Sequence, residues 1–215
     1  MRVVVVLASL LALSFAACGE KRPAADPEIG GVVRGPSGFY GSALPEPRPA
    51  PPMRLVEHGG RTFDLAEQRG RVVLLFFGYT HCPDVCPTTL ADWRRVKGEL
   101  GADTAKVRFV FVSTDPARDT PEVAQSYARR FDPSFIGLTG DSATLATLQR
   151  AFMVASVAGP RDTAHADPHA GHTSYEVAHS SRTFVIDRAG QWRLLLPAGG
   201  MPAAITADVK KLLAE

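Results

Sequence analysis

Long apolar runs alternate along this chain with amphipathic segments, and their order predicts an α/β fold. Residues 72–79 and 107–112 are almost entirely apolar, as expected for strands that are buried on both faces of a sheet. The segment between them, from near Pro87 to Leu100, predicts a helix with one apolar face. That face is formed by Leu90, Trp93, Val96 and Leu100.

The second half of the chain continues the alternation. Thr120 precedes Pro121, which favours the first position of a helix, so we expect a helix that reaches Phe131. Asp141 is expected to cap a helix running to about Met153. Four further elements are expected: an edge strand at 61–65, a strand at 135–138, a hairpin of 183–187 and 191–196, and a closing helix at 203–213. This order predicts a thioredoxin-like sandwich, in which helices flank a central mixed sheet.

The N-terminal region lacks this patterning and predicts an export signal. Arg2 precedes an apolar run, residues 3–13, that is too short for a comfortable membrane span and leads through small residues to Cys18. Residues 1–17 therefore resemble a bacterial lipoprotein signal peptide, after which Cys18 is lipidated. An ordinary cleaved signal and an uncleaved anchor are the alternatives. Each places the rest of the chain outside the cytoplasm, facing the periplasm or another oxidising space of the bacterial envelope.

A proline-rich stretch separates this signal from the patterned part of the chain. Residues 18–53 are rich in Pro, Gly and Ala, which predicts a disordered tether; a partly ordered strap at Val32–Val33 and Phe39–Tyr40 is the alternative. The folded domain is then expected at residues 54–215. The whole chain carries a formal net charge of only +2, which does not suggest a nucleic-acid partner.

Candidate chemistry lies in Cys82 and Cys86, which follow the first buried strand. Because Pro87 is not tolerated inside a helix, the helix should begin near Cys86 and leave Cys82 in the preceding turn. The positive end of that helix is expected to lower the thiol pKa. Two thiols at this spacing can bind Cu(I) or zinc, or can cycle as a disulfide.

Histidines supply candidate partners for the thiols. His179 precedes the strand at 183–186, whose start faces the cysteine turn in a thioredoxin-like sheet. Its imidazole would complete a three-coordinate copper site, and a structural or surface role is the alternative. His165, His169 and His172 could form a second metal site, and the simpler alternative is that they lie in a mobile polar loop. His81 is expected to be structural and to point away from the thiols, and Asp84 and Asp115 are not expected to be ligands.

Four segments together resemble the Sco/SenC copper chaperones of cytochrome c oxidase assembly. They occur in the family's order at residues 77–87, 113–121, 131–140 and 175–180. The resemblance implies a thioredoxin-like fold, membrane attachment, and copper, as Cu(I) or Cu(II), bound by Cys82, Cys86 and His179. Ala178 departs from the acidic residue that often precedes the family's histidine.

The expected function is therefore that of a membrane-anchored metallochaperone that delivers one copper to the copper-site subunit of cytochrome c oxidase. The alternatives are a dedicated thiol–disulfide reductase that keeps the oxidase copper-site cysteines reduced, and a redox or copper sensor. Three residues separate the cysteines, and no proline directly precedes the late strand, both unlike thioredoxin-type reductases; this favours metal binding. Another periplasmic copper chaperone and a thiol reductant are further expected partners.

Overall fold

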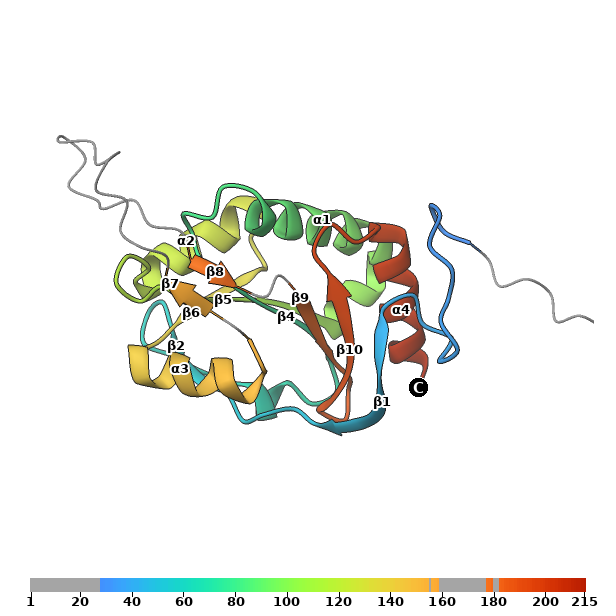
Figure 1. Cartoon of the computed structure of the whole chain (residues 1–215), viewed down its shortest axis with the longest axis horizontal. Coiled ribbons are helices and arrows are strands. Elements are labelled where there is room, and N and C mark those ends of the chain that lie inside the picture. Colours follow the sequence, from blue (N-terminus) through green and yellow to red (C-terminus); the bar gives the residue numbers. More distant parts are fainter. Residues whose placement is uncertain (1–27, 155, 159–176, 180–181) are drawn as a thin grey trace, which may run out of the picture.

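The computed structural model describes residues 28–154, 156–158, 177–179 and 182–215, and a mixed sheet forms its centre (Figure 1). The strands of this sheet are β1 (Ser42–Pro49), β2 (Arg54–Glu57), β3 (Thr62–Asp64), β4 (Val72–Gly78), β5 (Val107–Ser113), β6 (Ile136–Thr139), β9 (Arg182–Ile186) and β10 (Gln191–Pro197). Their order across the sheet is β1-β10-β9-β4-β5-β6-β2-β3. Strands β4, β5 and β6 run parallel, and the other pairs are antiparallel.

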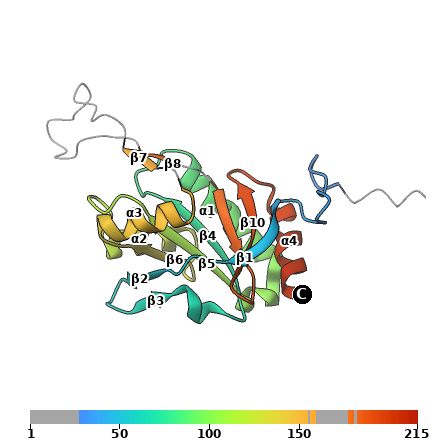
Figure 2. The ribbon, with the colours of Figure 1, turned by 60° about the horizontal axis from the view of Figure 1, so that its bottom comes forward.

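Helices cover both faces of the sheet (Figure 2). They are α1 (Val85–Leu100), α2 (Pro121–Phe131), α3 (Ser142–Ala151) and α4 (Pro202–Ala214), with short 3-10 helices at Leu65–Gln68 and Gly101–Lys106. One core cluster packs α1, α2 and α4 against one face, and a second cluster packs α3 against the other. Figure 1 shows α1 and α3 on these opposite sides. The arrangement confirms the expected thioredoxin-like sandwich.

Strand β4 is the centre of both clusters, because its side chains alternate between the two faces. Val72, Leu74 and Phe76 join the cluster under α1, whereas the residues between them join the cluster under α3. Every residue of β4 is buried. Burial of each large apolar side chain contributes about 1.5–3 kcal/mol, so the turn that follows β4 departs from a strongly held strand.

Local sequence signals correctly located the helices. Helix α2 begins after Thr120, whose hydroxyl accepts a hydrogen bond from Val123 N at 3.3 Å. Asp141 caps α3 in the same way, with 2.8 Å to Thr144 N. Strand β2 was not expected; it lies between β3 and β6.

The folded part of the chain begins earlier than the sequence predicts. Strand β1 lies inside the stretch expected to be a tether and pairs with β10. Phe39 is buried, and the carboxylate of Asp208 on α4 accepts hydrogen bonds from the backbone N–H groups of Tyr40 (2.8 Å) and Gly41 (2.7 Å). The predicted domain start at Arg54 is therefore wrong, because residues 39–53 are part of the folded domain. Strand β1 can contain prolines because it lies at the edge of the sheet, where one side of the strand needs no hydrogen-bond donors.

The described residues contain no helix that is long and apolar enough to span a membrane. Cys18 and the expected signal, residues 1–17, lie outside the described residues.

Candidate metal centre

The cysteine turn begins at Gly78, where β4 ends against the thiols. A Cβ atom added at Gly78 would lie 2.8 Å from Sγ of Cys86 and 2.9 Å from a ring carbon of Phe111. Real Cβ atoms do not approach other atoms so closely, so glycine is needed for the strand end to meet the sulfur. The turn is also fixed to β5, because Thr114 N donates a 2.8 Å hydrogen bond to the carbonyl of Gly78.

The two cysteines lie together, as the spacing predicts. Cys82 occupies the turn, and Cys86 lies in the first turn of α1. The N–H of Cys86 donates a hydrogen bond to Sγ of Cys82 at 3.4 Å, and the two cysteines are not joined by a disulfide. Cys82 is 8% exposed and Cys86 is fully buried. The pair therefore forms a dithiol with one inner sulfur and one outer sulfur.

Burial changes the acidity expected for the inner thiol. The pKa of Cys86 is raised far above its ordinary value, first by burial and then by a hydrogen bond with the Cys82 side chain. A backbone hydrogen bond with Tyr79 opposes this rise but is the weaker effect. The expectation that the helix N-terminus lowers the pKa is wrong for Cys86, because desolvation disfavours a buried thiolate. Cys86 therefore keeps its proton at neutral pH until a metal or a disulfide replaces it.

Tyr127 of α2 adds an aromatic wall that sequence reasoning missed. Its ring centroid lies 5.2 Å from that of Phe111, and its hydroxyl is buried without a hydrogen-bond partner among the described residues. Its pKa is raised by burial and, to a lesser extent, by charge on Cys86 and Cys82. Aromatic residues at helical spacing usually pack in a core, so the sequence carries no signal for this placement.

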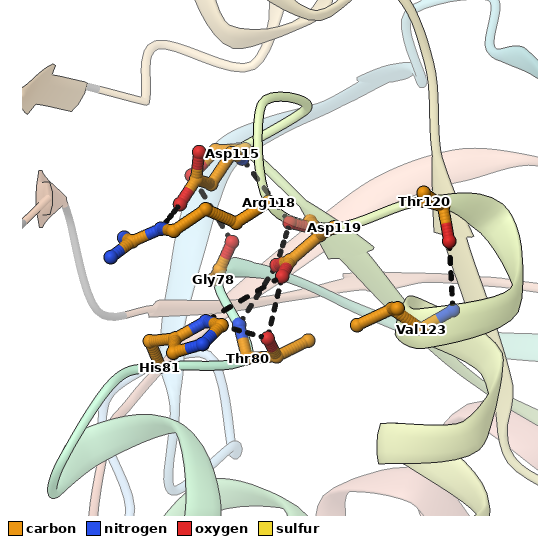
Figure 3. Close-up of polar contacts among 10 residues, drawn as sticks. Gly78, Thr80, His81, Asp115, Arg118, Asp119, Thr120 and Val123 are labelled. Atoms are coloured by element: carbon orange, nitrogen blue, oxygen red, sulfur yellow. Dashed lines mark hydrogen bonds and ion pairs between the residues drawn. The ribbon is translucent and has the colours of Figure 1, made fainter. Parts of the chain in front are cut away.

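A buried carboxylate, Asp119, holds the outer part of the turn (Figure 3). It accepts hydrogen bonds from Thr80 N at 2.9 Å, from Thr80 Oγ1 at 2.5 Å and from the hydroxyl of Ser113 at the end of β5. Nδ1 of His81 lies 3.1 Å from Thr80 Oγ1 and 3.8 Å from Asp119 Oδ1. Asp119 thus joins two segments that are 39 residues apart in the chain. Nothing in the local sequence distinguished it from the other acidic residues.

The two other acidic residues considered in the sequence have contacts of their own. Asp115 forms an ion pair with Arg118, whose guanidinium lies 5.8 Å from the centre of the Tyr79 ring. Asp84 occupies the N-cap position of α1 without a side-chain cap hydrogen bond, and its carboxylate accepts a 3.5 Å hydrogen bond from Thr88 Oγ1. These contacts are consistent with structural roles for both carboxylates.

The backbone places His179 near the turn. His179 ends β8 (Val177–His179), which pairs with β7 (Ser156–Ala158). Shortly after it, Thr183 of β9 pairs with Phe76 of β4, two residues before the strand end at Gly78. Figures 1 and 2 both show β8 beside the turn between β4 and α1. The chain that carries His179 therefore enters the sheet where the cysteine turn leaves it.

The described side chains do not complete a metal site by themselves. Among them, no group of three His, Cys, Asp or Glu residues is arranged to hold a metal ion. Only the backbone of His179 is described, and His165, His169 and His172 lie outside the described residues. Cys82 and Cys86 supply two soft donors, and a three-coordinate site would take its third donor from outside the described side chains.

Known proteins resemble this chain in sequence and in fold. The SCO1/SenC family model matches residues 43–214. Apo Sco1 of Thermus thermophilus is 37% identical, with a TM-score of 0.67 over 82% of this chain and 96% of that one. Bradyrhizobium japonicum ScoI with copper bound is 34% identical, with a TM-score of 0.66 over 76% of this chain and 99% of that one. A SCO2-like protein of Rickettsia prowazekii is 34% identical over 143 residues, which span 66% of this chain and 65% of that protein.

Proposed function

The chain belongs to the SCO1/SenC family, and we propose from this premise that it is a copper metallochaperone. It binds one copper ion through the sulfurs of Cys82 and Cys86 and an imidazole nitrogen of His179. It then delivers the ion to the binuclear copper site of cytochrome c oxidase. Proteins of the Sco family are described as cytochrome c oxidase assembly proteins. The observation that carries the proposal is the buried pair of cysteines, which form no disulfide and whose inner sulfur, that of Cys86, packs against Gly78.

The donor set fits copper better than zinc. Two thiolates and one imidazole form a soft, low-coordinate site of the kind that Cu(I) accepts. A structural zinc site closes with four protein ligands, and the described residues hold only these two cysteines. Burial of Cys86 keeps water away from the inner sulfur. Copper is the cargo of the protein and leaves by exchange of these ligands for those of the recipient.

Membrane attachment is the second part of the proposal. The lipidated residue is Cys18, after removal of residues 1–17. Stable anchoring requires more than one acyl chain, as bacterial lipoproteins carry. The domain then faces the periplasm, where the oxidase copper-site subunit, another copper chaperone and a thiol reductant are accessible partners.

A dedicated thiol–disulfide reductase is the second candidate, and the contact between the two cysteines favours it. In this reaction Cys82 attacks a partner disulfide and forms a mixed disulfide, with release of one partner thiol. Cys86 then loses its proton and displaces the second partner thiol, leaving a Cys82–Cys86 disulfide. An external thiol reductant must supply two electrons to restore the dithiol. Because burial keeps the proton on Cys86 at neutral pH, the second step is slow.

One pair of reactions separates the two candidates. Copper-loaded full chain is mixed with the reduced, metal-free copper-site domain of an oxidase, and metal-free chain is mixed with the oxidised domain. The metallochaperone predicts copper transfer in the first mixture, lost when Cys82 or Cys86 is replaced by Ser. The reductase predicts thiol release in the second mixture, faster than that caused by a small dithiol. Absence of copper transfer together with rapid thiol release would replace the first candidate by the second.

A further inference from the structure

A cavity of about 410 Å³ lies beyond the carboxyl ends of β5 and β6. Its walls come from three parts of the chain: the segment between β5 and α2, the segment between β6 and α3, and strand β2. Cavities of about 300–1,000 Å³ are the size that holds small molecules. Neither cysteine lines this cavity, so it is separate from the proposed copper site.

The strand topology explains why a cavity lies at this place. The chain leaves β5 toward α2 on one face of the sheet and leaves β6 toward α3 on the opposite face. Because β5 and β6 are neighbouring parallel strands, their connections diverge and leave a crevice between them. In open α/β sheets, ligands bind in such a crevice, outside the carboxyl ends of the strands. Helix α2 also begins here, at Pro121, and the positive end of its dipole favours a negative ligand group.

One polar side chain of the cavity lacks a partner. Thr139 ends β6 and lines the cavity, and it is only 3% exposed. Its hydroxyl forms no hydrogen bond within the part of the chain that the structure describes. A buried hydroxyl without a partner costs free energy, because folding removes it from water without replacing the lost hydrogen bond. A polar ligand group in the cavity would supply that bond.

Opposite charges at the cavity define the polar groups of its ligand. Nε of Arg54 pairs with Asp64 at 3.2 Å, but the Arg54 side chain is 72% exposed, so its guanidinium remains accessible to an anion. Asp141 is exposed, and hydrogen bonds from Thr144 lower the pKa of its carboxyl group, so it is ionised at neutral pH. Asp119 also lines the cavity, but three donors already converge on its carboxylate. The cavity therefore offers one accessible cation and one accessible anion.

Apolar walls define the body of the ligand. Leu55, Val56, Pro116 and Pro121 line the cavity between these charges. Val56 is 50% exposed, whereas most large apolar side chains of the described residues are buried. Covering apolar surface of this kind is favourable in proportion to the area removed from water. A branched aliphatic group would cover it.

We propose that this cavity binds a small zwitterion, a free α-amino acid with a branched aliphatic side chain. The carboxylate of the ligand pairs with Arg54 and accepts a hydrogen bond from Thr139. Its ammonium group donates to Asp141, and its side chain packs on Val56. The inference goes beyond the proposed copper function and does not depend on it.

The test uses the reduced, metal-free full chain and L-leucine as the probe. Binding is measured by calorimetric titration, and its place in the chain by the shifts of backbone amide signals in proton–nitrogen NMR spectra. We expect saturable binding at one site, with the largest shifts at Leu55, Val56 and Gly140, which line the cavity. Isocaproate lacks the ammonium group, and L-leucinamide lacks the carboxylate. Each should bind at least about tenfold more weakly, because it loses hydrogen bonds between charged groups.

Two variants remove the charges at exposed positions, where the fold tolerates the change. Arg54→Gln removes the cation, and Asp141→Asn removes the anion but keeps a favourable N-cap residue. Each should weaken L-leucine binding about tenfold. Arg61→Gln is the matched control, because Arg61 is an exposed arginine beside the same pair of strands that pairs with Glu57 and does not line the cavity. It should bind L-leucine as the wild type does.

Thr139→Val tests the unpartnered hydroxyl while preserving the shape of the side chain. Removal of a buried group that lacks a partner should not lower the urea midpoint of the free protein, yet it should weaken L-leucine binding. Unchanged binding in this variant would contradict the assigned role of Thr139.

The other outcomes overturn the proposal. They are the absence of saturable L-leucine binding at millimolar concentration, isocaproate or L-leucinamide binding as tightly as L-leucine, and wild-type affinity in both Arg54→Gln and Asp141→Asn. Amide shifts confined to residues away from the cavity would also overturn it. None of these outcomes bears on copper uptake, so the proposed copper function is tested separately.

Discussion

The end of the central strand lies directly against the inner thiol: a methyl group at Gly78 would be 2.8 Å from Sγ of Cys86. The same methyl would meet ring carbons of Phe76 at 2.8 Å and Phe111 at 2.9 Å. These three neighbours are buried in the same core cluster, so none of them can move away without disturbing the packing of that cluster. The position of the Cys86 sulfur thus depends on a residue that has no side chain.

Gly78→Ala should therefore displace Cys86 and destabilise the domain. Overpacking of this kind costs about 1–3 kcal/mol of unfolding free energy, measured by urea denaturation of the reduced protein. Copper affinity should fall in the same variant. Gly98→Ala is the control, because Gly98 lies in α1 with no atom within 4 Å of an added Cβ. That change should stabilise the helix by about 0.5–1 kcal/mol, and equal stability of both variants would contradict the steric account.

Part of this site could be predicted from the sequence, and the remainder depends on distant contacts. The apolar run of β4 and the position of Pro87 correctly placed Cys82 in a turn and Cys86 at a helix start. Burial of Cys86, which reverses the expected shift of its pKa, arises from packing that no local pattern encodes. The role of Asp119 likewise depends on a bond to Thr80 across 39 residues.

Contacts between residues that are distant in the sequence also explain why the sequence places the start of the domain too late. Proline-rich segments bury little surface by themselves, so composition favours a tether for residues 18–53. Strand β1 is ordered instead by pairing with β10, and Asp208 contacts the backbone 167 and 168 residues earlier. A sequence pattern read over short windows cannot detect such pairing.

Phe39→Ala should destabilise the protein even though Phe39 precedes the predicted domain. The ring is 4% exposed and lies 4.0 Å from the ammonium group of Lys211. Truncation of a buried phenylalanine costs about 3–5 kcal/mol. Val33→Ala is the control, because Val33 is 62% exposed and should change stability little. Urea denaturation of both variants decides the point, and an unchanged midpoint in Phe39→Ala would restore the tether interpretation.

Copper affinity should rise with pH over an unusually wide range. The pKa of Cys86 is raised, so this thiol is protonated at neutral pH and must release its proton when copper binds. Each released proton increases affinity about tenfold per pH unit for as long as the free thiol remains protonated. The increase should continue above about pH 9, where an ordinary thiol is already ionised. Competition with a chelator of known pH dependence measures this, and a plateau below pH 9 would show that Cys86 has ordinary acidity.

Asp119→Asn should weaken the turn that carries Thr80 and His81. Three donors converge on the Asp119 carboxylate. Because an amide replaces one acceptor oxygen by an NH2 donor, at least one of these donors loses its acceptor. Leaving a buried donor unsatisfied costs about 1–3 kcal/mol, measurable as a lower urea midpoint. Asp141→Asn is the matched control, because Asp141 is an exposed N-cap where asparagine is equally favoured. A midpoint for Asp119→Asn equal to that of the control would mean that the network carries no stability.

The most direct test of the three-ligand copper site is a Cu(I) titration of the reduced full chain against a chromophoric competitor. We expect one tightly bound copper per chain, loss of tight binding in Cys82→Ser and Cys86→Ser, and affinity at least about tenfold weaker in His179→Ala. His58→Ala should bind as the wild type does, because His58 lies in the turn between β2 and β3. Wild-type affinity in His179→Ala would contradict the proposed ligand set.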